Sequence, residues 1–233
     1  MISFAQDIFI SRGGRADWPR FARWHYRSHQ IGLVRSIAVL WHGQPTDRDD
    51  VAPLFPETPR PHSPHPRSPR PDPSDAAGRP DNDPPPGPRP IGIAVFVSPP
   101  MSLAGRNRFF GRRGSWSRLD IRMMNRQLVL LQRLVVHPSY RGAGLSVPFL
   151  EAACDRTGVR WVETLTGLGQ THPVFERAGF VRVGRVSLPP AKRTRAGHSA
   201  IFGGRTVSAE TFRKSAYTSP VYYLRRSDEH NRS

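Results

Sequence analysis

Cysteine is almost absent from this sequence, since Cys154 is the single one among 233 residues. One cysteine excludes an intrachain disulfide framework and a zinc site built from several cysteines. Long apolar runs are also missing, because no stretch approaches the roughly 20 apolar residues of a membrane-spanning helix. The first residues lack the basic and then apolar pattern of a secretory leader. These absences predict a soluble, cytoplasmic protein without a membrane partner.

Acidic residues and lysine are scarce as well. The chain has 18 Asp and Glu against 35 Lys and Arg, a net charge of +17, and Lys192 and Lys214 are its only lysines. A GC-rich genome would explain why arginine replaces lysine, but not why positive charge exceeds negative charge. A basic surface attracts phosphate polyanions, and the guanidinium group forks onto phosphate oxygens. DNA or RNA is therefore a candidate partner, bound through an Arg-rich surface.

Apolar side chains are nearly missing from residues 44–90, which are rich in Pro, Asp, Arg and Ser. Such a segment buries too little surface to offset the entropy of ordering, and repeated proline favours an extended chain. We predict a disordered insertion there. Residues 1–43 are too few for a domain and are expected to combine with 91–188 into one. A basic C-terminal segment, 189–233, follows and contains a possible last strand.

The remaining chain alternates between strand-like and helix-like patterns. Apolar runs rich in β-branched residues predict strands, and apolar residues at helical spacing predict helices. The predicted strands are residues 2–13, 36–42, 91–97, 127–138, 159–169, 180–186 and 220–226. The predicted helices are 16–29, with Asp17 as its cap, 141–158 and 172–179. This order predicts a mixed α/β sheet, with 36–42 and 91–97 paired as a hairpin around the insertion.

One segment, residues 101–128, has no clear period. It carries many arginines together with glycines and aromatic residues. One interpretation is a solvated loop with a short helix. The other is a basic, aromatic-bearing arm that meets nucleic acid or the phosphate of a cofactor. The sequence leaves both open.

The stretch VVHPSYRGAGLS, residues 135–146, carries the strongest chemical pattern. A strand runs into a turn of small residues and then a helix, which leaves unpaired backbone N–H groups at the helix N-terminus, where phosphate binds. Gly142, Ala143 and Gly144 keep side chains out of the way, and Arg141 adds positive charge. The spacing is that of neither the P-loop nor the Rossmann fingerprint. The alternative is an ordinary tight turn.

These residues resemble the acyl-CoA-binding motif of the GNAT superfamily of N-acyltransferases, Arg/Gln-x-x-Gly-x-Gly/Ala. Arg141, Gly144 and Ser146 stand at its fixed positions, with Ser where Gly or Ala is usual. Residues 172–184 are similar to the later helix and strand of that superfamily. The resemblance implies a GNAT-like α/β fold with a mixed, mostly antiparallel sheet flanked by helices. It also implies acetyl-CoA or another acyl-CoA as cofactor, and attack of an amine on the thioester.

The resemblance also assigns a cofactor site. The backbone of Val135 and Val136 would meet the pantetheine arm, and the thioester would lie between the strand ending at Val136 and the next strand, 159–169. The residues implied to hold the pyrophosphate are Arg141, Gly142, Ala143, Gly144, Leu145 and Ser146.

The catalytic residues usual in the superfamily are not found. Phe175 stands where a thiolate-protonating Tyr is frequent. Gln132 and Arg133 stand where a carboxylate base is common. The expected replacements are polar groups near the cofactor: His25, Tyr26 and Asp120 as catalytic candidates, and Thr171 and His172 at the start of the short helix.

Two further uses of these residues are open. His25, Tyr26 and Asp120 are also suitable metal ligands if they converge. If no acid or base takes part, the protein is a non-catalytic module that binds CoA or nucleic acid. We expect His137 to be structural and Cys154 to face the core.

A fainter similarity concerns the acceptor. The segments around residues 23–27 and 90–100 resemble acyltransferase-like domains fused to ATPases and phage Mom-type proteins that modify DNA. With the positive charge, this favours a nucleic-acid base as acceptor over the alternative, an amine of a protein or small molecule.

Overall fold

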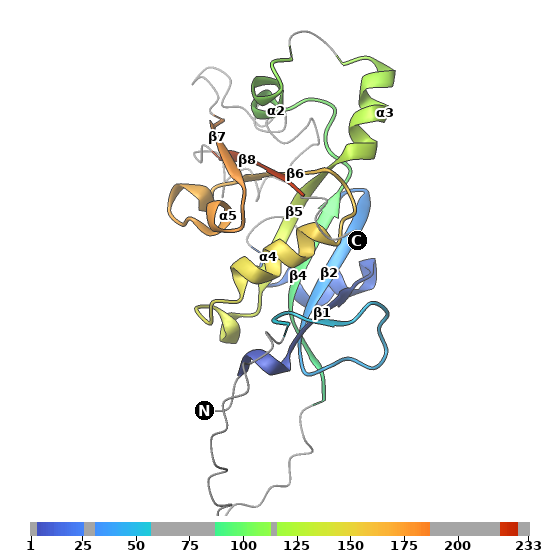
Figure 1. Cartoon of the computed structure of the whole chain (residues 1–233), viewed down its shortest axis with the longest axis vertical. Coiled ribbons are helices and arrows are strands. Elements are labelled where there is room, and N and C mark those ends of the chain that lie inside the picture. The colour runs from blue at the N-terminus through green and yellow to red at the C-terminus, as the bar shows by residue number, and fades with distance from the viewer. Residues whose placement is uncertain (1–3, 26–30, 57–86, 113–115, 187–219, 228–233) are drawn as a thin grey trace, which may run out of the picture.

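The computed structural model describes residues 4–25, 31–56, 87–112, 116–186 and 220–227 (Figure 1). Most of the predicted insertion, much of the C-terminal segment and Tyr26 lie outside these residues. In the part of the chain that is described, no helix is long and apolar enough to cross a membrane.

The described residues form one eight-stranded sheet in the order β3-β1-β2-β4-β5-β6-β8-β7. Every pairing is antiparallel except that of β5 with β6. This confirms the predicted class, a mixed and mostly antiparallel α/β sheet flanked by helices. The strands are β1 (Ile8–Arg12), β2 (Val34–His42), β3 (Ala52–Pro53), β4 (Arg89–Val97), β5 (Leu128–Val136), β6 (Trp161–Thr166), β7 (Val181–Arg185) and β8 (Val221–Arg226).

Helices cover both faces of this sheet. In Figure 1, α4 crosses in front of the central strands, α5 lies beside it, and α2 and α3 gather at the end where β5 begins. The opposite face is covered by α1, whose Trp18 and Phe21 pack against Ile37 and Val39 of β2. The helices are α1 (Trp18–Ala22), α2 (Ala104–Phe109), α3 (Arg118–Gln127), α4 (Ser146–Asp155) and α5 (Val174–Arg177).

Cover on both faces explains why β4 reads as a continuous apolar run. Its Ala94 and Phe96 point into the core under α4, and its Ile93 and Val95 into the core under α1. Successive side chains of a strand face opposite sides, so a strand buried on both sides needs apolar residues throughout. β4 pairs antiparallel with β2, which confirms the predicted hairpin across the insertion.

The first part of the predicted insertion packs on the sheet. Ala52 and Pro53 form β3 against β1, and Leu54 is buried. Arg48 reaches the buried carboxylate of Asp17, with Arg48 Nη2 2.7 Å from Asp17 Oδ1. Asp17 therefore makes no capping bond to α1, contrary to the prediction, and α1 is shorter than predicted.

The aperiodic segment forms two helices, α2 and α3, instead of a loop with one short helix. Ser117 caps α3, and its hydroxyl accepts a hydrogen bond from the Asp120 amide at 3.1 Å. Arg106 of α2 is fully buried and pairs with Glu163 of β6, Arg106 Nη2 lying 2.5 Å from Glu163 Oε1. Arg106 is therefore part of the protein core and cannot bind a polyanion.

Cys154 lies on the core side of α4, as predicted, and is fully buried. Burial raises the pKa of its thiol to about 12, so almost no thiolate exists near neutral pH. We expect the native protein to show no reaction with an aromatic disulfide reagent at pH 8, and one thiol per chain to react in denaturant. Rapid reaction of the native protein would contradict this burial.

Candidate functional site

Strands β5 and β6 diverge halfway along their length. They pair in parallel from Leu128 opposite Trp161 to Leu131 opposite Thr164. Beyond that point residues 132–136 of β5 have no partner on β6, although β4 still pairs with β5 as far as Val136. The two neighbouring strands therefore leave a gap whose β5 edge offers backbone groups without a ladder partner, as predicted for the thioester.

A cavity of about 770 Å³ occupies this gap. Its walls are residues 131–136 of β5, the end of β6, the chain just after α1, and the loop before α5. His25 and His172 face it from opposite sides of the gap, and Arg141 and Ser146 line the end near α4. No Asp or Glu is among the described residues that line it, so the cavity has a positive to neutral wall. We call it the notch.

The turn that follows β5 is held in place by its own side chains. His137 Nδ1 accepts a hydrogen bond from the Ser139 amide at 3.2 Å, and Arg141 Nε donates to the Val136 carbonyl at 3.1 Å. Trp24 packs edge-on against the His137 ring, with centroids 4.4 Å apart. These contacts fit the structural role predicted for His137.

Two glycines give the turn its backbone path. Gly142 has φ of 85° and Gly144 has φ of 77°, a region that side chains disfavour. A Cβ built on either one meets no atom within 4 Å. The glycines are therefore needed for backbone conformation and leave open space in front of the turn.

This turn presents a row of free donors. Among the described residues, the backbone N–H groups of Gly142, Gly144, Leu145, Ser146 and Val147 donate no hydrogen bond. The last two begin α4, whose dipole adds positive potential at the same end. Arg141 is exposed at the mouth. A diphosphate fits such a donor set without displacing any bond of the protein.

The structure brings some of the predicted site residues to the notch and not others. Val135, Val136, Arg141, Ser146 and His25 line it. Leu145 is buried and anchors the start of α4, so it contributes its amide alone. Tyr26 lies outside the described residues, so its side chain has no described place.

Asp120 lies elsewhere. It belongs to the first turn of α3, which leads into Leu128 at the closed end of β5, whereas the notch opens beyond Leu131. Hydrogen bonds from the Ser117 backbone and hydroxyl, together with Arg112, hold the pKa of Asp120 below its usual value. A carboxylate so stabilised is a weak base. Nor does a metal site emerge, since the described part of the chain holds no cluster of three His, Cys, Asp or Glu.

The residues that replace the usual acid and base have structural contacts. Phe175 stacks on Tyr223 of β8 with ring centroids 5.3 Å apart. The Tyr223 hydroxyl donates to Glu176 Oε1 at 2.6 Å, and burial raises its pKa to about 12. Gln132 Oε1 accepts from the Gly32 amide at 2.8 Å. Neither Phe175 nor Gln132 can act as a general acid or base. Among the described residues that line the notch, His25 and His172 are the side chains suited to this role.

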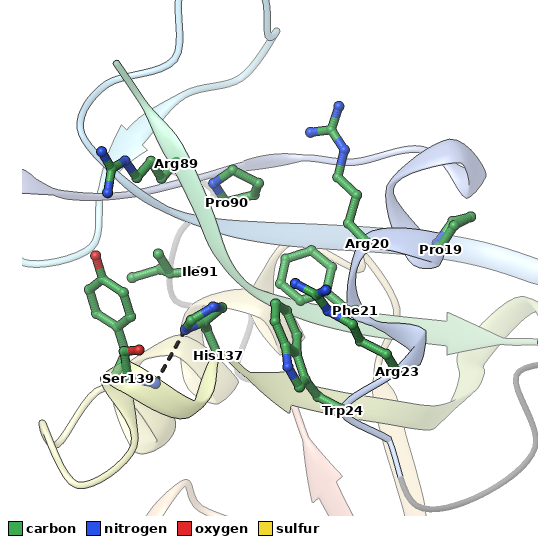
Figure 2. Close-up of a pocket in the computed structure, with 11 residues that line it drawn as sticks. Pro19, Arg20, Phe21, Arg23, Trp24, Arg89, Pro90, Ile91, His137 and Ser139 are labelled. Carbon is green, nitrogen blue, oxygen red and sulfur yellow. Dashed lines mark hydrogen bonds between the residues drawn. The ribbon is translucent and has the colours of Figure 1, made fainter. Parts of the chain in front are cut away.

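A second cavity, of about 630 Å³, was not predicted from the sequence. Figure 2 shows Arg20 and Arg23 of the α1 region and Arg89 of β4 around it. Trp24 and His137 form its floor, and Trp24 also lines the notch. The spacing of Arg20, Arg23 and Trp24 by three and four residues was the available signal, since it places them on one face of a helical turn. We call it the arginine cavity.

Comparisons with known proteins give limited information. No protein-family model matches the sequence, and no curated protein matches it. A structure of AAC(6')-Ib in complex with Parmomycin and AcetylCoA has 17% identity and a TM-score of 0.34, and the match covers 62% of this chain and 64% of that one. The chain thus matches less than two thirds of that enzyme.

Two other solved structures match over more of the chain. The GNAT family N-acetyltransferase YhbS from Escherichia coli in complex with CoA has 14% identity and a TM-score of 0.42, covering 96% of this chain and 83% of that one. An HPA2-related acetyltransferase from Corynebacterium glutamicum has 9% identity and a TM-score of 0.40, covering 94% and 96%. These values are too low to transfer a substrate or a mechanism. What the site does must be argued from its own geometry.

Proposed function

We propose that this chain is a GNAT-type N-acyltransferase that uses acetyl-CoA or another acyl-CoA. The observation that carries the proposal is the adjacency of a diphosphate cradle, the unpaired amides of residue 142 and residues 144–147, to the gap between β5 and β6. An acyl-CoA joins a diphosphate to an extended arm with amide groups, and this arm ends in a thioester. The cradle suits the diphosphate, and the adjoining gap suits the arm and the thioester. The amide groups of such an arm can pair with the free edge of β5 as a short extra strand.

Each part of the site has a task in this proposal. Arg141 and the turn amides hold the diphosphate, and the backbone of Val135 and Val136 aligns the arm. When bound, the cofactor supplies an acyl carbonyl joined to a good leaving group. The protein positions the amine next to this carbonyl and excludes water, and positioning alone lowers the barrier substantially.

The two histidines divide the proton transfers. An amine must lose a proton as it attacks, and the departing sulfur must gain one. His25 lies on the side of the notch that adjoins the arginine cavity, where an acceptor enters, and we assign it as the base. His172 lies on the opposite side, close in sequence to Phe175, and we assign it as the donor to sulfur. An imidazole can perform either role near neutral pH.

Binding of CoA to the cradle is tested by a matched pair of variants. Gly144→Val and Gly158→Val both place a β-branched residue at positive φ with open space around the added Cβ. We expect similar losses of thermal stability. Only Gly144→Val should raise the Kd for CoA, by at least about tenfold, because the new side chain covers the turn amides. Isothermal titration with CoA measures the difference.

The wild-type protein provides the reference for this test. A saturating concentration of CoA should raise its melting temperature, since 100 times Kd adds about 2.7 kcal/mol of stability. No CoA binding by the wild type, or equal loss in both variants, would refute the cradle.

A non-catalytic CoA-binding module is the second candidate. It is favoured by the stacked Phe175 and the bonded Gln132, which leave the usual proton carriers absent. Labelled acetyl-CoA incubated with DNA, tRNA and basic protein separates the two. An N-acyltransferase transfers label to the DNA, the tRNA or the basic protein. A binding module is stabilised against heat by CoA but gives no labelled product.

A further inference from the structure

The arginine cavity adjoins both the notch and the turn that carries the CoA cradle, since Ser139 and Tyr140 of that turn line it. Trp24 lines both cavities. Val136 lines the notch, and the next residue, His137, lines the arginine cavity. A ligand seated in the arginine cavity therefore lies next to the place where the acyl group is delivered.

The charge of this cavity is unbalanced. Arg20, Arg23 and Arg89 line it and are exposed, and no carboxylate is among the described residues of its wall. Within the described chain, none of the three forms an ion pair with Asp or Glu. Three like charges around one cavity repel one another unless an anion lies between them. Arginine presents several donors in a fork that matches phosphate.

Aromatic rings form about half of the rest of the wall. Arg23 lies over the Trp24 ring with its guanidinium carbon 4.4 Å from the centroid. Trp24 is half-buried, and Phe21, His137 and Tyr140 line the cavity together with smaller residues. Aromatic rings and stacked guanidinium groups bind the flat faces of nucleobases, while arginine binds the backbone. Figure 2 shows the His137 and Trp24 rings side by side, with Arg23 next to Trp24 and the guanidinium groups of Arg89 and Arg20 farther from the rings.

We infer that the arginine cavity binds a nucleotide unit of a nucleic-acid strand, with its phosphate on Arg20 and Arg89 and its base against Trp24. This rests on the proposed function, since the base would then offer its exocyclic amine to the notch. The bonds balance simply: an N–C bond to the acyl carbon forms, the C–S bond breaks, and the amine proton passes by way of the histidines to the released thiol.

The same wall disfavours cationic acceptors. A polyamine or an aminoglycoside needs carboxylates to pair with its ammonium groups, and the described walls of both cavities contain none. The shared chemistry of a phosphate next to a base could come from a free nucleotide or from a strand, so the experiment includes both.

The test uses two double variants with the same change of net charge. Arg20→Gln/Arg89→Gln alters the cavity, and Arg118→Gln/Arg122→Gln removes two exposed arginines of α3 that line neither cavity. The probes are a fluorescein-labelled single-stranded DNA of mixed sequence, the corresponding duplex, and AMP. Binding is followed by anisotropy for the DNA and by calorimetry for AMP, at several salt concentrations. CoA binding by each variant is measured in parallel.

We expect the wild type to bind the single strand more tightly than the duplex. The cavity variant should weaken binding at least tenfold and reduce the salt slope by about 0.7, the value for one phosphate contact on a single strand. The α3 variant should change affinity less than threefold, and both should bind CoA as the wild type does. Binding of AMP alone, lost in the cavity variant, would support a free nucleotide as the source.

Three results would overturn the inference. Equal losses of DNA affinity in the two variants would mean nonspecific attraction to a basic surface. If the wild type binds none of the probes, the cavity is not a nucleotide site. Loss of CoA affinity in the cavity variant alone, with DNA binding unchanged, would assign the arginines to the cofactor. A failure of the proposed function appears differently, as a wild type that does not bind CoA.

Discussion

Replacing Glu163 with alanine is expected to lower the free energy of unfolding by about 3–5 kcal/mol. Glu163 is fully buried on β6, and its Oε2 accepts from Arg106 Nε at 2.9 Å and from the Tyr222 hydroxyl at 2.7 Å. The variant leaves the Arg106 charge inside the protein without its counterion, in a medium where an unpaired charge is strongly unfavourable. Urea denaturation of the wild type and the variant measures the difference.

Two controls separate this charge effect from simple loss of contacts. Arg182→Ala removes an exposed ion pair whose Arg182 Nη1 lies 3.6 Å from Glu176 Oε1, and should cost less than about 1 kcal/mol. Glu163→Leu combined with Arg106→Met removes both charges and should recover much of the lost stability. A Glu163→Ala protein as stable as the wild type would mean that this pair is not buried in solution.

Replacing His25 with alanine is expected to reduce kcat/KM for acyl transfer by about 10²-fold to 10⁴-fold, the usual contribution of a positioned general base. His25 and His172 are the two imidazoles that line the notch among the described residues, and His25 is on the acceptor side. The rate is measured as transfer of labelled acetyl groups to whichever of DNA, tRNA or basic protein the wild type labels.

The pH profile distinguishes a base from a packing residue. The wild-type rate should fall on the acidic side as the base is protonated, and this limb should disappear in the variant. Added imidazole should restore part of the rate, and CoA affinity should be unchanged. If His25→Ala keeps the wild-type profile while His172→Ala loses the acidic limb, the two roles are exchanged.

Local patterns predicted the frame of the site well. The β2–β4 hairpin followed from two β-branched runs on either side of a proline-rich segment. The turn at residues 138–146 followed from glycines, which take positive φ as the structure confirms at Gly142 and Gly144. The divergence of β5 and β6 was expected from the resemblance to a family, and the pairing ends at Leu131 accordingly. The turn depends on neighbouring residues, and the hairpin follows from the order of two strand-like segments along the chain.

The features that the sequence did not reveal depend on distant partners. Arg106 looked like one more solvated arginine, because its partner Glu163 is far along the chain. Asp17 looked like a helix cap, but Arg48 competes for its carboxylate. Asp120 was expected near the cofactor, whereas its carboxylate accepts a hydrogen bond from the amide of Ser117, the cap of α3. The sequence shows where a charged residue lies in the chain, but its ion-pair partner is determined by tertiary packing.

The position of β8 has a consequence for the order in which the molecule assembles. β8 lies inside the sheet, between β6 and β7, although among the described strands it comes last in the chain. Until residues 221–226 leave the ribosome, β6 and β7 each expose an unpaired edge, and such edges favour wrong pairing with other chains. Tyr222 and Tyr223 also arrive with this strand, and both are fully buried. Completion of this half of the sheet therefore has to wait until β8 has been synthesised, whereas the β1–β5 half can close beforehand.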